Sequence, residues 1–192
     1  MPMRHKDENK SESIFNAAIK LINEEGLAEI SMSKIAKKAG VSASTIYVYF
    51  ENKEDMLNKL YLNVKKKMSQ EVLFKYDDSI SIQAAFENTL RKFANFILNN
   101  QDEFLCIEQF SNSPLLLNLS RKEGSELFEP LFSLFEKGKR QNIFKQVDTS
   151  LLHIFMFYPV MQYVKEYFSG QVELKQDNLN EIIQMSWEAL KA

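Results

Sequence analysis

A short run of residues after Gly40 carries side chains that could bind nucleic acid. It reads Val-Ser-Ala-Ser-Thr-Ile-Tyr-Val-Tyr-Phe over residues 41–50. Hydroxyls and phenols hydrogen-bond phosphates and base edges, and small residues at the front of a helix let it lie deep in a major groove. Ile46 and Phe50 are four residues apart and would pack inward on the same helix face. The outward side chains would then be those of Ala43, Ser44, Thr45, Tyr47 and Tyr49.

A second short helix and a tight turn would position this run. Ser31 is a suitable N-cap for the preceding helix, in which Ala36 and Ala39 are small enough for a close crossing. Gly40 permits the positive φ of a tight turn. Ser42 can cap the following helix, whose first amide groups can face a phosphate. Together these residues predict a helix-turn-helix.

The rest of the chain also has a helical pattern. Only 5 glycines and 4 prolines occur in 192 residues, which disfavours a turn-rich sandwich or barrel, and apolar residues recur at helical spacing. Residues 1–10 are polar and are expected to be frayed. Pro130 is expected to kink a helix or to begin one. No strand is predicted, and the expected helices cover residues 11–25, 32–39, 43–50, 53–74, 80–98, 102–110, 125–139, 149–168 and 178–190.

Charge is distributed unevenly along the sequence. The chain has 24 Lys and Arg against 26 Asp and Glu, a net charge of −2. Residues 1–67 hold 12 basic and 9 acidic side chains, whereas residues 68–192 hold 12 and 17. The asymmetry suggests an anion-binding head on an acidic body, with chance as the alternative explanation.

Several classes of protein are disfavoured. The single cysteine, Cys106, and the two histidines, His5 and His153, provide neither a disulfide framework nor a histidine- and cysteine-rich metal site. No glycine-rich phosphate loop, nucleophile elbow or His-x-x-x-His pair occurs, so we expect no catalytic residue, metal or cofactor, and no enzyme. The sequence has no apolar run of about 18 residues and no secretory signal, so we expect a cytoplasmic protein that is not membrane-bound.

Three segments together resemble one known family. They are Ile35-Ala-Lys-Lys-Ala-Gly-Val-Ser42, Thr45-Ile-Tyr-Val-Tyr-Phe50 and Asn52-Lys-Glu-Asp-Met-Leu57, and upstream Ile14, Ala17, Ala18, Leu21, Gly26 and Ser31 have matching spacing. Over about residues 11–60 the chain resembles the tetracycline-repressor (TetR) family of bacterial transcription regulators. The resemblance implies an all-α fold, with an N-terminal three-helix head that carries the helix-turn-helix (1–50) and a C-terminal helical bundle for dimerisation and ligand binding (51–192).

The resemblance also implies which residues contact DNA. Its second motif helix is the recognition helix, and the positions just after that helix and at the start of the first motif helix reach the DNA backbone or the bases. Ser33 and Ala43 are shorter than the side chains of many relatives, which predicts sparse base readout and a larger part for DNA shape. The implied contact residues are Ser33, Lys34, Ser42, Ala43, Ser44, Thr45, Tyr47, Tyr49 and Lys53.

The remaining expectations concern the partners. A single recognition helix buries too little surface for tight binding, whereas a dimer reads two half-sites about one DNA turn apart. The resemblance therefore implies a homodimeric repressor of a palindromic double-stranded operator, released by a small hydrophobic or aromatic effector. Candidate effector contacts are Phe93, Phe104, Glu108, Phe128, Phe132, Tyr158 and Gln162, and candidate dimer contacts are Phe155, Met161, Ile182, Ile183 and Met185. For the apolar residues of both sets, the alternative is packing in the core of a single chain.

Two alternatives stay open. The first is a DNA-binding regulator of the same fold without a small effector, controlled by a protein partner or by its abundance. The second is a helical interaction protein whose motif has lost DNA binding, against which Thr45, Tyr49 and Lys53 argue.

Overall fold

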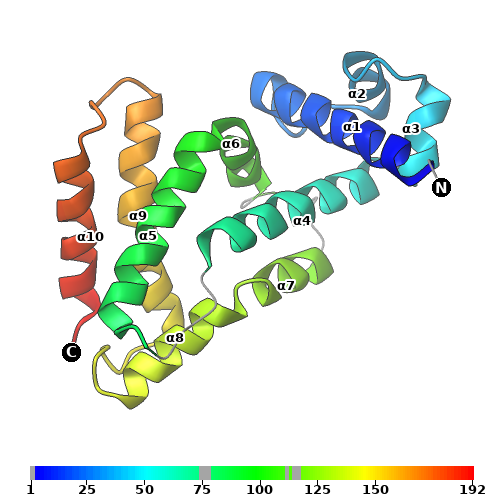
Figure 1. Cartoon of the computed structure of the whole chain (residues 1–192). Coiled ribbons are helices and arrows are strands. Elements are labelled where there is room, and N and C mark those ends of the chain that lie inside the picture. The colour runs from blue at the N-terminus through cyan, green and yellow to red at the C-terminus, as the bar shows by residue number, and fades with distance from the viewer. Residues whose placement is uncertain (1–2, 74–78, 111–112, 114–117) are drawn as a thin grey trace. The chain divides into compact units, whose positions relative to one another are not determined.

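The computed structural model describes residues 3–73, 79–110, 113 and 118–192, and within these residues it has helices and no strand (Figure 1). The predicted all-α class is therefore confirmed. The helices are α1 (Met3–Glu25), α2 (Met32–Lys38), α3 (Ala43–Tyr49), α4 (Lys53–Val72), α5 (Ile82–Asn99), α6 (Gln101–Phe110), α7 (Asn118–Glu126), α8 (Glu129–Arg140), α9 (Thr149–Phe168) and α10 (Gln176–Leu190).

The helices form two compact units. The first contains the described residues of 1–65 and 100–124, which include the helix-turn-helix and α6. The second contains those of 66–99 and 125–192, which include α5 and α8 to α10. Each unit contains two separate stretches of the chain, so the units are not simply consecutive. The long helix α4 begins in the first unit and ends in the second.

In the first unit, α1 provides the apolar base on which the helix-turn-helix packs. Ile14, Ala18, Leu21 and Ile22 are all buried, as their helical spacing predicts. The side chain of Asn23 donates a hydrogen bond to the Asp102 carbonyl of α6 (2.9 Å). The expectation of a frayed start is wrong for residues 3–10, because α1 already begins at Met3, and residues 1 and 2 lie outside the described residues.

In the second unit, α5, α9 and α10 lie side by side around an aromatic core (Figure 1). The ring of Phe144 is fully buried and lies 5.6 Å from Trp187, 6.0 Å from Phe135 and 6.3 Å from Phe86, between centroids. Such tilted and edge-on arrangements are favoured by aromatic pairs. The backbone of Gly138 passes directly beneath this ring.

The helix expected over 125–139 is interrupted. The structure ends α7 at Glu126 and begins α8 at Glu129, with Pro130 in the first turn of α8. Proline is tolerated there because the first amide groups of a helix have no partner within it. The alternative that Pro130 begins a helix is therefore the correct one.

Candidate nucleic-acid interface

The turn of the helix-turn-helix has the geometry that its residues predict. The Ser31 side chain caps α2 by accepting a hydrogen bond from the Lys34 amide (3.3 Å). Gly40 has a φ of +68°, in the region that favours glycine. The amide of Val41 donates to the carbonyl of Ala36 (3.0 Å), and this bond fixes the path of the chain out of α2.

Helix α3 rests on a buried apolar base. Ile46 is fully buried, and Phe50, at the end of the helix, is 3% exposed. The ring of Phe50 packs against Phe15 of α1, with centroids 5.4 Å apart, and the Lys59 ammonium lies 5.6 Å from its centroid. These contacts hold one face of α3 against the first unit, so the opposite face is free for a partner.

A group of hydroxyls marks the start of α3. The Ser42 hydroxyl accepts a hydrogen bond from the Thr45 amide (3.0 Å), as the predicted N-cap should. It also lies 2.8 Å from the Ser44 hydroxyl and 2.7 Å from that of Thr45. The three hydroxyls thus hydrogen-bond one another. A base or phosphate that binds one of them would have to replace one of these hydrogen bonds.

Most of the predicted contact residues of α3 are accessible. Ser42, Ala43 and Ser44 are exposed and Tyr47 is 55% exposed, whereas Thr45 and Tyr49 are half-buried. The sequence prediction omitted Val48, which is 80% exposed. The sequence could have indicated this exposure. Val48 comes two residues after the inward-facing Ile46, and two residues turn an α-helix by about 200°, which places Val48 on the opposite side.

The predicted lysines have partners within the first unit. The Lys34 ammonium bonds the Glu25 carboxylate (2.6 Å) and the Glu29 carbonyl (2.9 Å), and Lys53 donates to the Ala28 carbonyl (3.3 Å). Ser33 is exposed next to Lys34, with its hydroxyl 3.1 Å from that of Ser31. Both ammonium groups stay partly accessible, so they could exchange these partners for phosphates.

The start of α4, next to Lys53, is held by reciprocal caps. The Asn52 side chain accepts from the Asp55 amide (2.8 Å), and the Asp55 carboxylate accepts from the Glu51 amide (3.0 Å). Partial burial would raise the pKa of Asp55, but its hydrogen bonds with Lys59 and the Glu51 amide outweigh this effect and lower the pKa. The charged cap therefore fixes the backbone that carries Lys53.

Neutralising Glu25 is expected to strengthen binding to DNA of any sequence. Glu25→Gln would release the Lys34 ammonium and remove one negative charge from the head. We expect about a two- to fivefold gain in affinity for random duplexes at low salt, with a salt slope steeper by about one unit. Fluorescence anisotropy titrations at several salt concentrations measure both quantities.

The control for this prediction is Glu12→Gln, which removes the same charge from an exposed position of α1. Glu12 is not part of the ion pair between Lys34 and Glu25, so Glu12→Gln should raise the affinity for random duplexes only slightly. An unchanged affinity in Glu25→Gln, or an equal gain in both variants, would show that the Glu25 pair does not restrain Lys34.

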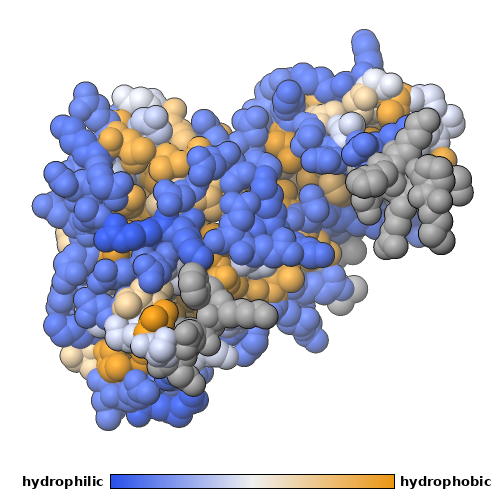
Figure 2. Space-filling model, in the orientation of Figure 1, coloured by the Kyte–Doolittle hydropathy of each residue, from blue (hydrophilic) through white to orange (hydrophobic). Residues whose placement is uncertain are grey.

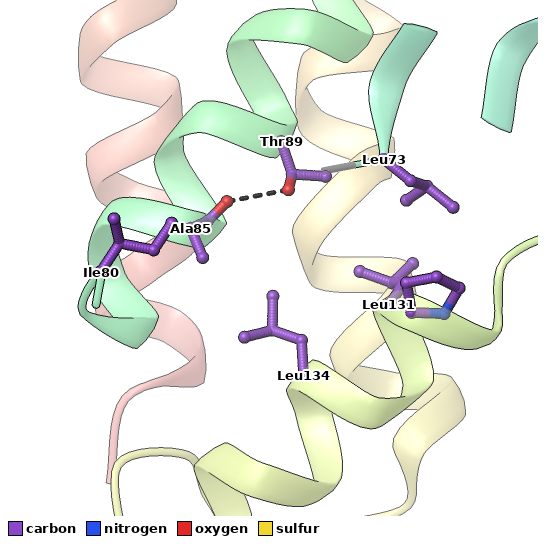
Figure 3. Close-up of a pocket in the computed structure, with 7 residues that line it drawn as sticks. Leu73, Ile80, Ala85, Thr89, Leu131 and Leu134 are labelled. Atoms are coloured by element: carbon purple, nitrogen blue, oxygen red, sulfur yellow. Dashed lines mark hydrogen bonds between the residues drawn. The ribbon is translucent and has the colours of Figure 1, made fainter. Parts of the chain in front are cut away.

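The second unit contains a small apolar pocket (Figure 3). Its volume is about 10 Å³, the room of about one water molecule. The Thr89 hydroxyl, the polar side-chain group of the pocket, donates to the Ala85 carbonyl (2.8 Å), so it is already satisfied. The pocket is lined by Leu73, Ile80, Ala85, Thr89, Pro130, Leu131 and Leu134.

None of the candidate effector residues lines this pocket. Phe104 and Glu108 are in the first unit and the other five in the second, so the seven do not all belong to one unit. Phe93 is buried edge-on against Phe157, with centroids 4.9 Å apart, and Phe104 is 2% exposed. The others are half-buried or exposed: Glu108, Phe128, Phe132, Tyr158 (53% exposed) and Gln162, whose amide bonds Glu166 (3.1 Å).

Glu108 lies near Lys65, a half-buried lysine. Burial lowers the pKa of Lys65, and the negative charge of Glu108 partly offsets this effect. The two charges belong to α4 and α6 of the first unit. In this state Glu108 thus faces a cation of its own chain.

Comparison with known proteins decides the family. Residues 14–60 match the N-terminal domain model described as bacterial regulatory proteins, tetR family, and residues 81–191 match the tetracyclin repressor-like C-terminal domain. The second match alone covers more than half of the chain. The chain belongs to the TetR family. TetR-family proteins are transcription regulators and not enzymes, and their helix-turn-helix binds DNA.

Relatives of the TetR-family chain extend over its full length. It is 22% identical over 189 residues to an uncharacterised HTH-type transcriptional regulator of Haemophilus influenzae, covering 98% of this chain and 100% of the relative. It is 51% identical over 57 residues to the fatty acid metabolism regulator protein of Bacillus subtilis, covering 30% and 28% of the two chains. A TetR-family regulator from Marinobacter aquaeolei has the same fold, with a TM-score of 0.92, 24% identity and coverage of 98% and 99%.

The second unit of this TetR-family protein exposes apolar side chains on α9 and α10, and Figure 2 shows hydrophobic patches between the hydrophilic parts of the surface of this unit. Phe155 is 54% and Met185 70% exposed, whereas Met161 and Ile182 are half-buried. Ile183 is 1% exposed and therefore packs in the core of its own chain. The sequence prediction omitted Leu151 and Ile154, which are 45% and 42% exposed.

The single thiol is expected to be unreactive in the folded protein. Burial raises the pKa of Cys106, and the nearby charges of Glu103 and Asp102 raise it further, to about 12. Since the thiolate is the reactive form, only about one thiol in ten thousand is ionised at pH 8. A chromogenic disulfide reagent should therefore react slowly with native protein and with one thiol per chain after denaturation. Rapid reaction of the native protein would contradict this placement of Cys106.

None of the helices in the described part of the chain has the length and apolar character of a membrane span. Within the same residues, no group of three or more His, Cys, Asp or Glu side chains is arranged to hold a metal ion.

Proposed function

We propose that this TetR-family protein is a homodimeric transcription repressor of the cytoplasm that binds a palindromic operator through its head, residues 1–50. The observation that carries the proposal is the two-sided character of α3. Ile46 is fully buried, while Ser44, Tyr47 and Val48 are exposed on the other faces. A short helix held on a rigid base with an accessible outer face suits insertion into a major groove.

In this proposal, contacts to bases and to phosphates are divided between two groups of residues. Ser42, Ala43, Ser44, Thr45 and Tyr47 face base edges or nearby phosphates. Tyr49, Lys53, Ser33 and Lys34 fix the position of the head on the DNA backbone. The backbone role of Lys34, Lys53 and Tyr49 follows from their chemistry, because ammonium and phenol groups donate to phosphates and carry little sequence information there. The places of Ser33 and Tyr47 follow the family resemblance.

The dimer is supported by the apolar side chains exposed on α9. Leu151, Ile154, Phe155 and Tyr158 follow the i, i+3, i+4, i+7 spacing of one helix face. A contiguous exposed apolar face of this kind is typical of an interface. Met185 and Ile182 of α10 would extend it, and a twofold axis would bring the same residues of two chains together.

The effector would be a small hydrophobic or aromatic molecule bound in the second unit. The aliphatic lining of the pocket near Thr89 supports this class. The match to the fatty acid regulator covers 57 residues, so the chemistry of the pocket and not that name is the basis of the proposal. Binding would favour a dimer whose recognition helices have the wrong separation for the operator.

A second candidate function stays open, because the described pocket near Thr89 by itself has no room for a drug-sized effector. A cavity of about 10 Å³ is far smaller than the roughly 300–1,000 Å³ of ordinary ligand sites. The alternative is a regulator of the same fold without a small effector, controlled by a protein partner. Thermal shift measurements with a panel of apolar and aromatic compounds distinguish the two, because only an effector-binding protein gains stability from a compound.

The test of DNA reading compares variants in a selection of duplexes from a random pool. Lys53→Ala should weaken binding to all duplexes and leave the enriched sequence unchanged. Thr45→Ala and Tyr47→Phe should change the enriched sequence itself. Equal losses in all three variants, without any change in sequence preference, would overturn the assignment of α3 as the recognition helix.

A further inference from the structure

Val48 is the most exposed large apolar residue in the described part of the chain, at 80%. It lies in α3, the second helix of the helix-turn-helix, one residue before the end of that helix. An isolated exposed apolar residue needs no explanation, but this one is part of a surface that the proposed function already assigns to a partner.

The geometry of α3 places Val48 on its outermost line. Ile46 is fully buried, and Val48 and Ser44 are two residues after and before it. At about 100° per residue, both lie about 200° from Ile46, on the opposite side of the helix. Tyr47 and Thr45 lie on the two flanks of the helix, each about 100° from Ile46, and Thr45 is half-buried there. When α3 enters a groove, Val48 and Ser44 therefore point most directly at its floor.

The side chains of α3 limit what they can recognise there. The helix reads Ala-Ser-Thr-Ile-Tyr-Val-Tyr and has no charged or amide side chain. It therefore cannot form the paired hydrogen bonds by which arginine or lysine reads guanine and asparagine or glutamine reads adenine. The Ser44 hydroxyl can donate or accept, so by itself it discriminates little between bases.

One apolar group is available on the floor of a major groove, the 5-methyl group of thymine. We propose that Val48 is a specificity-determining residue that reads thymine by packing its methyl groups on this 5-methyl group, once in each half-site. The inference rests on the proposed DNA-binding function and names the base that the exposed face of α3 selects. Ala43, also exposed, offers a second and smaller apolar contact on the same helix.

The test removes one methyl group from each side of the contact. The probe is the palindromic duplex that the wild-type protein enriches from a random pool, together with copies in which single thymines are replaced by deoxyuridine. Deoxyuridine lacks the 5-methyl group and keeps the hydrogen bonds of thymine. On the protein, Val48→Thr keeps the β-branched shape and replaces one methyl group by a hydroxyl. Because Val48 is exposed, this change leaves the core of the head intact.

We expect a double-mutant cycle with coupling at one thymine of each half-site. Replacing this thymine should lower the affinity of the wild-type protein about three- to fivefold, the effect of one buried methyl group. Val48→Thr should lower the affinity for the thymine duplex by a similar factor. The variant should then be insensitive to deoxyuridine at that position, because the contact is already lost.

Val147→Thr is the matched control, since Val147 is an exposed valine of the second unit (39%). It should bind both duplexes as the wild-type protein does. If a duplex is enriched but no deoxyuridine lowers affinity, or if Val48→Thr stays sensitive to deoxyuridine, the thymine inference is overturned while the DNA-binding function stands. If no duplex is enriched, operator reading fails and this inference fails with it.

Discussion

Replacing Phe155 by lysine is expected to yield a monomer that binds the operator about a hundredfold more weakly or worse. Phe155 is 54% exposed and lies between Leu151 and Tyr158 on the exposed face of α9. In the proposed dimer this ring is buried, and a buried ammonium without a partner carries a large desolvation penalty. A monomer then loses the second half-site, and a second linked site is commonly worth a factor of about 10² to 10⁴.

Sedimentation equilibrium and titration of the enriched palindrome measure the two effects. Leu174→Lys is the control, because Leu174 is also a partly exposed apolar residue of the second unit (37%) and lies between α9 and α10. It should stay dimeric and bind normally. A dimeric Phe155→Lys protein would show that this face of α9 is not the interface. If both Phe155→Lys and Leu174→Lys were monomeric, the loss of the dimer would not be specific to this face of α9.

Adding a methyl group at Gly138 is expected to destabilise the protein by about 2 kcal/mol and to lower its Tm by about 4–8 °C. A Cβ atom at this position would lie 2.1 Å from the Cδ2 atom of Phe144 and 2.6 Å from Cε2. The Phe144 ring is fully buried and is surrounded by Phe86, Phe135 and Trp187, so it has little room to move. The higher helix propensity of alanine, about 1 kcal/mol, offsets part of this cost.

Urea and thermal unfolding of Gly138→Ala measure this loss. Ser133→Ala, at an exposed position of the same helix, should change the free energy of unfolding by less than about 0.5 kcal/mol. Gly138→Ala at wild-type stability would mean that the Phe144 ring can shift without cost. The close approach of Gly138 to Phe144 would then not be a constraint of the fold.

Features that depend on a few adjacent residues were predictable from the sequence. Ser31, Ser42 and Asp148 cap the helices that follow them, and Gly26 and Gly40 have the positive φ values that their places at helix ends require. In each case the side chain or the glycine backbone determines the local conformation by itself. Such signals are enough to locate the helix-turn-helix.

Features that depend on how helices cross were not predictable. The pair between Lys34 and Glu25 forms across nine residues, because α2 packs on the end of α1. Asn142 adopts a left-handed conformation (φ 55°) after α8 without any glycine signal.

The effector candidates illustrate a third limit. A phenylalanine at helical spacing suits a core and a ligand pocket equally well, and Phe93 and Phe104 are buried in the core. The pocket is lined instead mostly by aliphatic residues, from α5, from α8 and from Leu73 and Ile80. Residue type alone could not distinguish a core residue from a residue that lines a ligand pocket, because burial of apolar surface stabilises both arrangements.

The central claim is that a symmetric dimer reads a specific DNA sequence. The most direct measurement is selection of bound duplexes from a random pool at a salt concentration of about 0.15 M, followed by sequencing. The account predicts enrichment of a palindrome whose half-sites are about one helical turn apart. Binding without enrichment, which weakens steeply as salt rises, would mean that the head binds phosphates and reads no bases, and it would contradict the account.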